Sequence, residues 1–471
     1  MNVSTRFRTG ETRIRTSKSP ARSLRHWQIQ VFAVSWITYA AFYFPRSAFS
    51  AAKVGILEDP TVNQVLTKQM LGNLDALYLA AYAVGQFVWG AVAERWGTRV
   101  VVTGGMILAG LAAVSMGLST ALWLFAPLMI TQGLAQATGW AALSKNIASF
   151  FTVARRGRMM GLFSTSYAFG GLVAAPVAGW FAYSLFDSWR VAFLAGGAII
   201  LVLLLLFLAL QRNNLRECGL PDIDVIDSAP PTAELATTGP ATTETATTGT
   251  GTSGTATTGS EPEPPAERRR MRPADLLAAA RHDSMVLRLG LSYFLLKPAR
   301  YAVLLWGPVL VLEAMPGVDK ITAILVPVAF GVAGLVAPVA LGWMSDTVFD
   351  ARRVPVCVLA LAVLVGVLCL WGPLTASGSI WLVSAALALI GLAAYGADAK
   401  ISGVAAVDFG TSRFAAGSAG FINGCGSVGA ILGGLLPGYF GGTTLFFGFA
   451  VAAALAAVIL APHWNRRPVS A

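Results

Sequence analysis

Two trios of tyrosine and basic residues recur in the sequence with the same spacing. They are Tyr39, Tyr43 and Arg46 in the first half of the chain and Tyr293, Lys297 and Arg300 in the second half. Each trio is spaced by four and then three residues, so a helix presents its side chains on one face. Guanidinium groups offer paired donors that match phosphate or carboxylate oxygens, whereas lysine acts as a compact point charge. The pattern predicts an anion-binding site.

The composition predicts that membrane helices position these trios. Of the 471 residues, 55% are hydrophobic and only 12% are charged, about half the charged share of a soluble domain. This excludes a soluble enzyme, and apolar runs of about 20 residues predict helices that cross a bilayer. We expect an all-α membrane protein with twelve transmembrane helices in two six-helix bundles. The expected spans are residues 28–50, 72–93, 99–119, 122–145, 158–183, 190–210, 285–313, 321–343, 354–374, 379–402, 414–437 and 443–461.

The segments outside the bundles are basic or low in complexity. The predicted division is a basic tail at 1–27, a first bundle at 28–210, a Thr-, Gly- and Pro-rich linker at 211–284, a second bundle at 285–461 and a short tail at 462–471. Such a linker cannot bury a core, so we expect it to be largely disordered. Most Lys and Arg residues fall in the tails, the linker and the gaps on the same side of the membrane. Only Lys53, Lys68, Arg190 and Lys320 fall in the other gaps.

This distribution places both termini and the linker in the cytoplasm by the positive-inside rule. It also accounts for the net charge of +11 without a nucleic-acid partner.

The basic residues of the trios lie within predicted spans. A charge at the bilayer centre costs roughly 2.5 to 3.5 kcal/mol on insertion scales, so these side chains should face the protein interior. Pro45 and Pro298 predict a bend in each helix. The alternative is that the trios form ion pairs between helices or reach toward the membrane surface.

Acidic partners for these cations are scarce. Asp398 lies in the tenth span, and Asp75 and Glu313 are expected nearer the membrane surfaces. Tyr395 and Asp398 share a helix face, so Asp398 either holds Arg300 or Lys297, or neutralises another lysine. The candidates for that other lysine are Lys145 and Lys400. The excess of cations favours an anionic solute.

A second repeated motif follows the second and eighth spans. GAVAERWGTR begins at Gly90 and GWMSDTVFDAR begins at Gly342, 252 residues later. Each motif pairs a helix-terminal glycine with an acidic residue and downstream arginines. The motif is either a turn with positive-inside charges or a cytoplasmic gate. The gating candidates are Glu94, Arg95, Arg99 and Asp346.

The sequence predicts neither a cofactor nor a metal site. The four cysteines are scattered without pairing or metal-ligand spacing. The three histidines lie in the tails or the linker. Glycine-rich runs such as GFINGCGSVGAILGG lie within an apolar span, which indicates close helix packing rather than a phosphate loop.

Several segments resemble the organophosphate:phosphate antiporter family of the major facilitator superfamily, which includes glycerol-3-phosphate and hexose-phosphate transporters. They are WITYAAFYFPRSAF, AYAVGQFVWGAVAERWGTR, GLAQATGWAALSK, GLFSTSYAFGG, RECGLPDID, ARYAVLLWGP, GWMSDTVF and DFGTSRFAAGSAGFINGCGSVGA. The resemblance implies the major facilitator fold, two six-helix bundles related by a pseudo-two-fold axis. It also implies one site at their interface that opens to each side in turn.

The family's site residues match positions of this chain. A pair of arginines that binds the phosphoryl group matches Arg46 and Arg300, and tyrosines of the site match Tyr39, Tyr43, Tyr82 and Tyr395. The chain departs from the glycerol-phosphate branch at four positions, Ser47, Gln86, Tyr167 and Leu305. Lys297 stands where that branch has tyrosine. The organic part of the substrate therefore does not carry over.

We expect a plasma-membrane secondary transporter, not an enzyme, that exchanges a phosphorylated small metabolite for inorganic phosphate. Two alternatives remain, a membrane sensor of the same fold that binds an organic phosphate and an organic-anion or carboxylate transporter. One chain should suffice, because the site needs no second copy. The predicted substrate-binding residues are Arg46, Arg300, Lys297, Tyr39, Tyr43, Tyr82, Tyr293, Tyr395, Asp398 and Tyr167.

Overall fold

The computed structural model describes residues 20–221, 223, 284–350, 352–405 and 415–465. Every regular element in these ranges is a helix. The first half contains α1 Pro20–Ala41, α2 Tyr43–Glu58, α3 Lys68–Trp96, α4 Thr98–Leu118, η1 Leu122–Leu124, α5 Phe125–Phe150, α6 Val153–Gly179, η2 Trp180–Leu185, α7 Trp189–Leu210 and η3 Arg216–Cys218. The second half contains α10 Ser284–Ala314, α11 Lys320–Leu325, α12 Val328–Thr347, α13 Arg353–Cys369, α14 Trp371–Ala376, α15 Ile380–Ala399, η4 Lys400–Ala405, α17 Ala415–Tyr439, α18 Gly442–Leu460 and η5 Ala461–His463.

In this described part of the chain, helices occupy all twelve expected spans. Eight of them are long and apolar enough to cross a membrane by length and composition. The four other spans correspond to α1 with α2, to α3, to α5, and to α13 with α14. Helix α13 alone has 17 residues, at the lower end of the length that crosses a bilayer core.

The first span differs from its predicted bounds of 28–50. The helix is interrupted between α1 and α2 and then continues to Glu58. Pro45 lacks a backbone N–H and cannot donate to the preceding turn, which accounts for a break at this point. The prediction that Lys53 lies in a loop is wrong, because Lys53 is a fully buried residue of α2.

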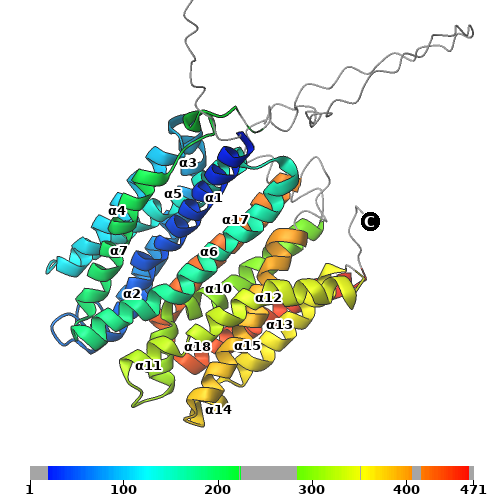
Figure 1. The fold of residues 1–471 in the computed structure, drawn as a ribbon. Coiled ribbons are helices and arrows are strands. Elements are labelled where there is room, and N and C mark those ends of the chain that lie inside the picture. Colours follow the sequence, from blue (N-terminus) through cyan, green and yellow to red (C-terminus); the bar gives the residue numbers. More distant parts are fainter. Residues whose placement is uncertain (1–19, 222, 224–283, 351, 406–414, 466–471) are drawn as a thin grey trace, which may run out of the picture.

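The same packing arrangement appears in both halves, as the predicted repeat requires. Helix α3 packs on α5 as α12 packs on α15, and α4 packs on α7 as α13 packs on α18. Figure 1 shows the two resulting groups of helices, one coloured from blue to green and the other from yellow-green to red. The predicted fold class of two related helical bundles is confirmed.

The two halves meet at several pairs of helices. Helix α2 packs on α10, α3 packs on α17, and α6 packs on α11 and α12. We call the face where α1 and α10 begin and α7 ends the terminal face. The face that carries residues 59–67 and 315–319 is the opposite face.

Polar contacts join the halves at the opposite face. The ion pairs are Lys68–Glu313 at 2.5 Å and Lys320–Glu58 at 2.9 Å. The Tyr439 hydroxyl at the end of α17 donates to the Asn73 amide oxygen of α3 at 2.9 Å. These contacts hold the opposite face closed in this conformation.

The beginning of the predicted linker packs on the terminal face of the first half. Gln211 is fully buried and its amide donates to the Asn146 amide oxygen at 2.6 Å. Leu215 and Ile223 are also buried. The prediction of disorder thus fails for this first stretch, because its polar and apolar groups find partners on the bundle. The predicted disorder of 224–283 lies outside the described residues.

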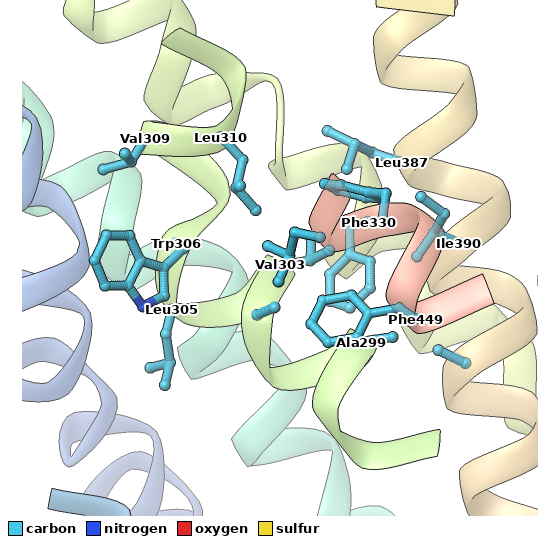
Figure 2. Close-up of a cluster of buried hydrophobic side chains, with 14 of the residues drawn as sticks. Ala299, Val303, Leu305, Trp306, Val309, Leu310, Phe330, Leu387, Ile390 and Phe449 are labelled. Atoms are coloured by element: carbon cyan, nitrogen blue, oxygen red, sulfur yellow. The ribbon is translucent and has the colours of Figure 1, made fainter. Parts of the chain in front are cut away.

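Helix α10 lies between the halves and is buried along much of its length. Figure 2 shows Trp306 on the side toward the blue helices of the first half, and Phe330, Leu387 and Ile390 toward the yellow helices of the second. The Trp306 indole donates to the Gly434 carbonyl of α17 at 3.0 Å. Pro298 and Pro308 lie inside this helix.

Replacement of Gly72 tests the close contact between the halves. A Cβ at Gly72 in α3 would lie 2.8 Å from the Leu435 carbonyl oxygen and 3.1 Å from the Gly438 Cα atom of α17. We expect Gly72→Leu to fold, because the clash lies between halves, and to separate them at the opposite face. Spin labels at positions 63 and 318 should move apart in double electron–electron resonance. Gly441→Leu, where a Cβ meets nothing within 4 Å, should leave this distance unchanged, and an unchanged distance in Gly72→Leu would contradict the closed packing.

Candidate functional site

The two predicted clamp arginines come together between the halves. Arg46 of α2 and Arg300 of α10 line the same cavity, which has a volume of about 70 Å³. Tyr43 and Tyr395 line it too, as does Tyr167 of α6. The cavity extends toward the opposite face past Pro308 and Ile324. Helices from both halves thus bring separate parts of the sequence to one site.

Arg46 is surrounded by aromatic rings. Only 7% of the residue is exposed, and its guanidinium carbon lies 5.4 Å from the Tyr43 ring centre, 5.6 Å from that of Tyr78 and 5.7 Å from that of Tyr301. Among the described residues, no carboxylate forms an ion pair with it, and its Nε and Nη2 atoms have no hydrogen-bond partner. Ring faces attract the cation only weakly compared with an anion. Arg46 therefore retains donors for a negatively charged group.

Arg300 has a carboxylate partner. Its Nη1 atom donates to Asp398 at 2.6 Å, and Lys297 lies 3.0 Å from the other oxygen of the same carboxylate. The Arg300 guanidinium also lies 3.9 Å from the Tyr395 ring centre. Asp398 thus contacts both basic residues of α10.

Asp398 contacts Arg300 and Lys297, the first of the two arrangements expected for it. Lys145, one of the two lysines of the other arrangement, donates to the Ala93 carbonyl oxygen at 3.1 Å. Asp398 lies at the end of α15, where the backbone widens into the π-helical turn η4, and the Ser402 hydroxyl donates to its carbonyl oxygen at 2.8 Å. Such π-turns recur at functional sites.

A larger cavity adjoins the first on the side of the terminal face. It has a volume of about 440 Å³ and is lined by Tyr82 and Gln86 of the first half and by Tyr293 and Lys297 of the second. The Lys297 ammonium lies 4.6 Å from the Tyr293 ring centre. Tyr301 lines both cavities. Space for an organic group therefore lies next to the basic residues.

Tyr39 lies behind the cavity wall rather than in it. Its ring centre is 6.2 Å from that of Tyr43 and 5.3 Å from that of Trp140, and it is absent from the lining of either cavity. The structure thus places Tyr39 where it supports Tyr43, and direct contact with a solute stays a prediction.

The four gating candidates do not join the halves in this conformation. Arg99 donates to the Leu208 carbonyl within the first half, and Asp346 pairs with Arg353 within the second. Glu94 and Arg95 are exposed. That these four residues form a gate stays a prediction. It concerns a conformation in which the terminal face is closed.

Sequence analysis missed two tyrosines and one ion pair. Tyr301 follows Arg300 directly and is four residues from Lys297, so helical spacing could have found it. Tyr78 stands four residues before Tyr82 on α3. The buried Lys53–Asp75 pair escaped detection because the apolar run was taken to end before the lysine.

The charges of the site can bind an anion. Three cations, Arg46, Lys297 and Arg300, line the two cavities. Among the described residues one carboxylate, Asp398, pairs with two of them, although it does not itself line either cavity. An uncompensated buried cation is costly, and an anion with several oxygens can satisfy guanidinium donors from both halves.

Comparison with known proteins agrees with this architecture. Residues 32–406 match the family described as Major Facilitator Superfamily. The chain belongs to the Major Facilitator Superfamily. The crystal structure of a D-xylose-proton symporter has the same fold, with a TM-score of 0.65 and 16% identity over 93% of this chain and 98% of that one.

Two relatives of this major facilitator chain are named as a membrane sensor protein and a probable transport protein. The membrane sensor protein UhpC of Salmonella typhimurium is 26% identical, over 94% of this chain and 92% of its own length. A probable hexose phosphate transport protein of Chlamydia muridarum is 25% identical, also over 94% and 92%. These relatives confirm the resemblance to organophosphate:phosphate antiporters. The chain is a multi-pass membrane protein of this transporter superfamily and not an enzyme.

Removal of the Asp398 charge tests whether this carboxylate competes with an anion for Arg300 and Lys297. Breaking a buried ion pair costs about 3 kcal/mol or more, so Asp398→Asn should lower the thermal unfolding temperature of the purified protein. Inorganic phosphate should raise this temperature more in the variant than in the wild type, because Arg300 and Lys297 lose a competing carboxylate. Asp187→Asn, at an exposed position, serves as the control. Equal stabilisation by phosphate in all three proteins would contradict this competition.

Proposed function

We propose that the protein exchanges a phosphorylated small metabolite, such as a sugar phosphate or a glycerol-phosphate-like compound, for inorganic phosphate. The observation that carries this proposal is the shared cavity of Arg46 and Arg300, one from each half. Phosphate oxygens match paired guanidinium donors. The relationship to a probable hexose phosphate transport protein supports the same substrate class.

In the proposed bound state, the phosphoryl group bridges the two arginines. Lys297 adds a third cation, and Tyr43, Tyr167 and Tyr395 surround the ligand. The organic group would occupy the larger cavity, where Tyr82 and Tyr293 stand. Asp398 holds Arg300 and Lys297 before binding and releases them to the incoming anion.

Exchange follows from the charges on the two halves. Arg46 and Arg300 repel each other across the cavity, and an anion between them removes this repulsion and draws the halves together. The occupied carrier can then open on the other side, whereas the empty carrier crosses slowly. Net movement of one solute therefore requires return of another.

The proposal includes the location and orientation of the chain. The protein resides in the plasma membrane with both termini in the cytoplasm, since basic residues gather at the terminal face. The larger cavity then faces the cytoplasm. One chain provides all residues of the site, so a monomer suffices for function.

A membrane sensor is the second candidate function. The observation in its favour is the 26% identity to the membrane sensor protein UhpC. A sensor would use the same cavity to bind an organic phosphate but would transmit the signal to a partner without transport. Cells that express this protein alone should accumulate labelled substrate only if it is a transporter.

Exchange in proteoliposomes tests the proposed function directly. Vesicles loaded with labelled inorganic phosphate should release it when a sugar phosphate or glycerol 3-phosphate is added outside. Binding without release would favour the sensor. Release by carboxylates that inorganic phosphate does not inhibit would favour the third candidate, an organic-anion transporter.

Conservative substitution tests the arginine pair. Arg46→Lys and Arg300→Lys keep the charge but lose the paired donors, so exchange should fall by roughly tenfold or more in each. Arg190→Lys, at the opposite face and outside the cavity lining, is the matched control and should retain exchange. Unchanged exchange in either cavity variant would remove bidentate binding by that arginine from the mechanism.

A further inference from the structure

A second buried ion pair lies outside the proposed clamp. Lys53 of α2 pairs with Asp75 of α3, and these residues are 0% and 1% exposed. Lys53 is seven residues after Arg46, two turns farther along the same helix toward the opposite face. Burial of two charges is costly unless both are well bonded, so this pair requires an explanation beyond stability.

The pair also contacts the second half of the protein. The Lys53 ammonium donates to the Leu305 carbonyl oxygen of α10 at 3.0 Å and lies 4.1 Å from the Trp306 ring centre. Figure 2 shows Leu305 and Trp306 together on the side of α10 toward the first half. Asp75 packs against Gly434 of α17. When the halves separate at the opposite face, the pair loses these contacts and meets water.

A small cavity with both polar and apolar lining residues borders Asp75 of the pair and Arg46 of the clamp. It has a volume of about 10 Å³, near the lower limit for one water molecule, and Arg46, Asp75, Tyr78 and Gln132 line it. Gln132 is 2% exposed, and neither its amide nitrogen nor its amide oxygen has a hydrogen-bond partner among the described residues. Arg46 lines both this cavity and the substrate cavity, so the charge of Asp75 acts on the same guanidinium that faces the substrate.

The charged and titratable groups that face Asp75 are few. Helix α2 contributes Lys53 and Arg46, and α3 itself contributes Tyr78. From α5 comes the uncharged Gln132. Helix α17 contributes Gly434, and α10 contributes the Leu305 carbonyl and Trp306, with Tyr301 beyond them beside Arg46. In this described environment Asp75 is the sole carboxylate.

We propose that Asp75 is a proton-binding site linked to anion binding at Arg46. The step adds one proton to a carboxylate oxygen of Asp75 and breaks no covalent bond. Lys53 stays an ammonium ion and keeps the Leu305 carbonyl and the Trp306 ring as partners. This inference rests on the proposed function in one respect, that Arg46 binds the anion.

The sign of the linkage follows from electrostatics. A proton on Asp75 removes a negative charge from the cavity that it shares with Arg46, so a bound anion is stabilised. By reciprocity, a bound anion increases the proton affinity of Asp75 by the same factor. A proton and the anion therefore bind together, and transport of the anion is linked to transport of a proton.

Proton uptake on binding of inorganic phosphate tests this linkage. Titration calorimetry at pH 8, in two buffers of different ionisation enthalpy, measures protons taken up per phosphate bound. We expect uptake in the wild type and in Asp187→Asn. In Asp75→Asn, phosphate should still bind but without this uptake. Uptake that persists in Asp75→Asn comes from the phosphate or another group and overturns the proposal.

Infrared difference spectroscopy tests the same site without a ligand. Spectra of the purified wild type at acidic minus alkaline pH should contain a protonated-carboxyl band that Asp75→Asn loses and Asp187→Asn keeps. Lys53→Met should lose the band from the difference spectrum but keep it in the absolute spectra at both pH values, because Asp75 without its cation stays protonated. A spectrum without any band due to Asp75 overturns the proton site. Failure of wild-type protein to bind phosphate would instead contradict the proposed function, and the infrared result decides the proton site separately.

Discussion

The cost of holding cations inside a membrane protein determines how this molecule is built. Arg46, Lys53, Lys297 and Arg300 all lie in membrane helices near the contact between the halves. Lys53 pairs with a carboxylate of the neighbouring helix, and Lys297 and Arg300 share one carboxylate. Arg46 lies among tyrosine side chains and forms no ion pair with a carboxylate of the described residues. The ring faces leave two guanidinium nitrogens of Arg46 without a hydrogen-bond partner. A bound anion is therefore stabilised most by its contact with Arg46.

The two halves repeat a fold but not a charge pattern. The first trio has tyrosine at the position where the second has Lys297, and the second half supplies the carboxylate of Asp398. The first half has its own buried carboxylate, Asp75, which pairs with Lys53, two turns beyond Arg46 on α2. As a result, two of the three cations of the proposed site lie in the second half, whereas the buried Lys53–Asp75 pair lies in the first.

Sequence reasoning succeeded where the structure follows a period. Helical spacing placed Tyr43 with Arg46, and Tyr293 with Lys297, on common faces, and apolar run lengths located the spans. It failed where partners come from distant parts of the chain. Nothing local could tell whether Asp398 pairs with Arg300, 98 residues away, or with Lys145. The predicted first span ended before Lys53, because a lysine is polar. In the structure Lys53 is buried, since Asp75 of α3 neutralises its charge.

The pairing of Asp398 with two cations affects how the membrane potential acts on the carrier. Three cations and one carboxylate leave two positive charges in the empty cavity, and these charges move relative to the field whenever the empty carrier reorients. Each elementary charge that crosses 100 mV involves about 2.3 kcal/mol. A doubly charged phosphate neutralises these two charges, and the proton proposed on Asp75 leaves one positive charge on the loaded carrier. Voltage would therefore act more strongly on the empty carrier than on the loaded one.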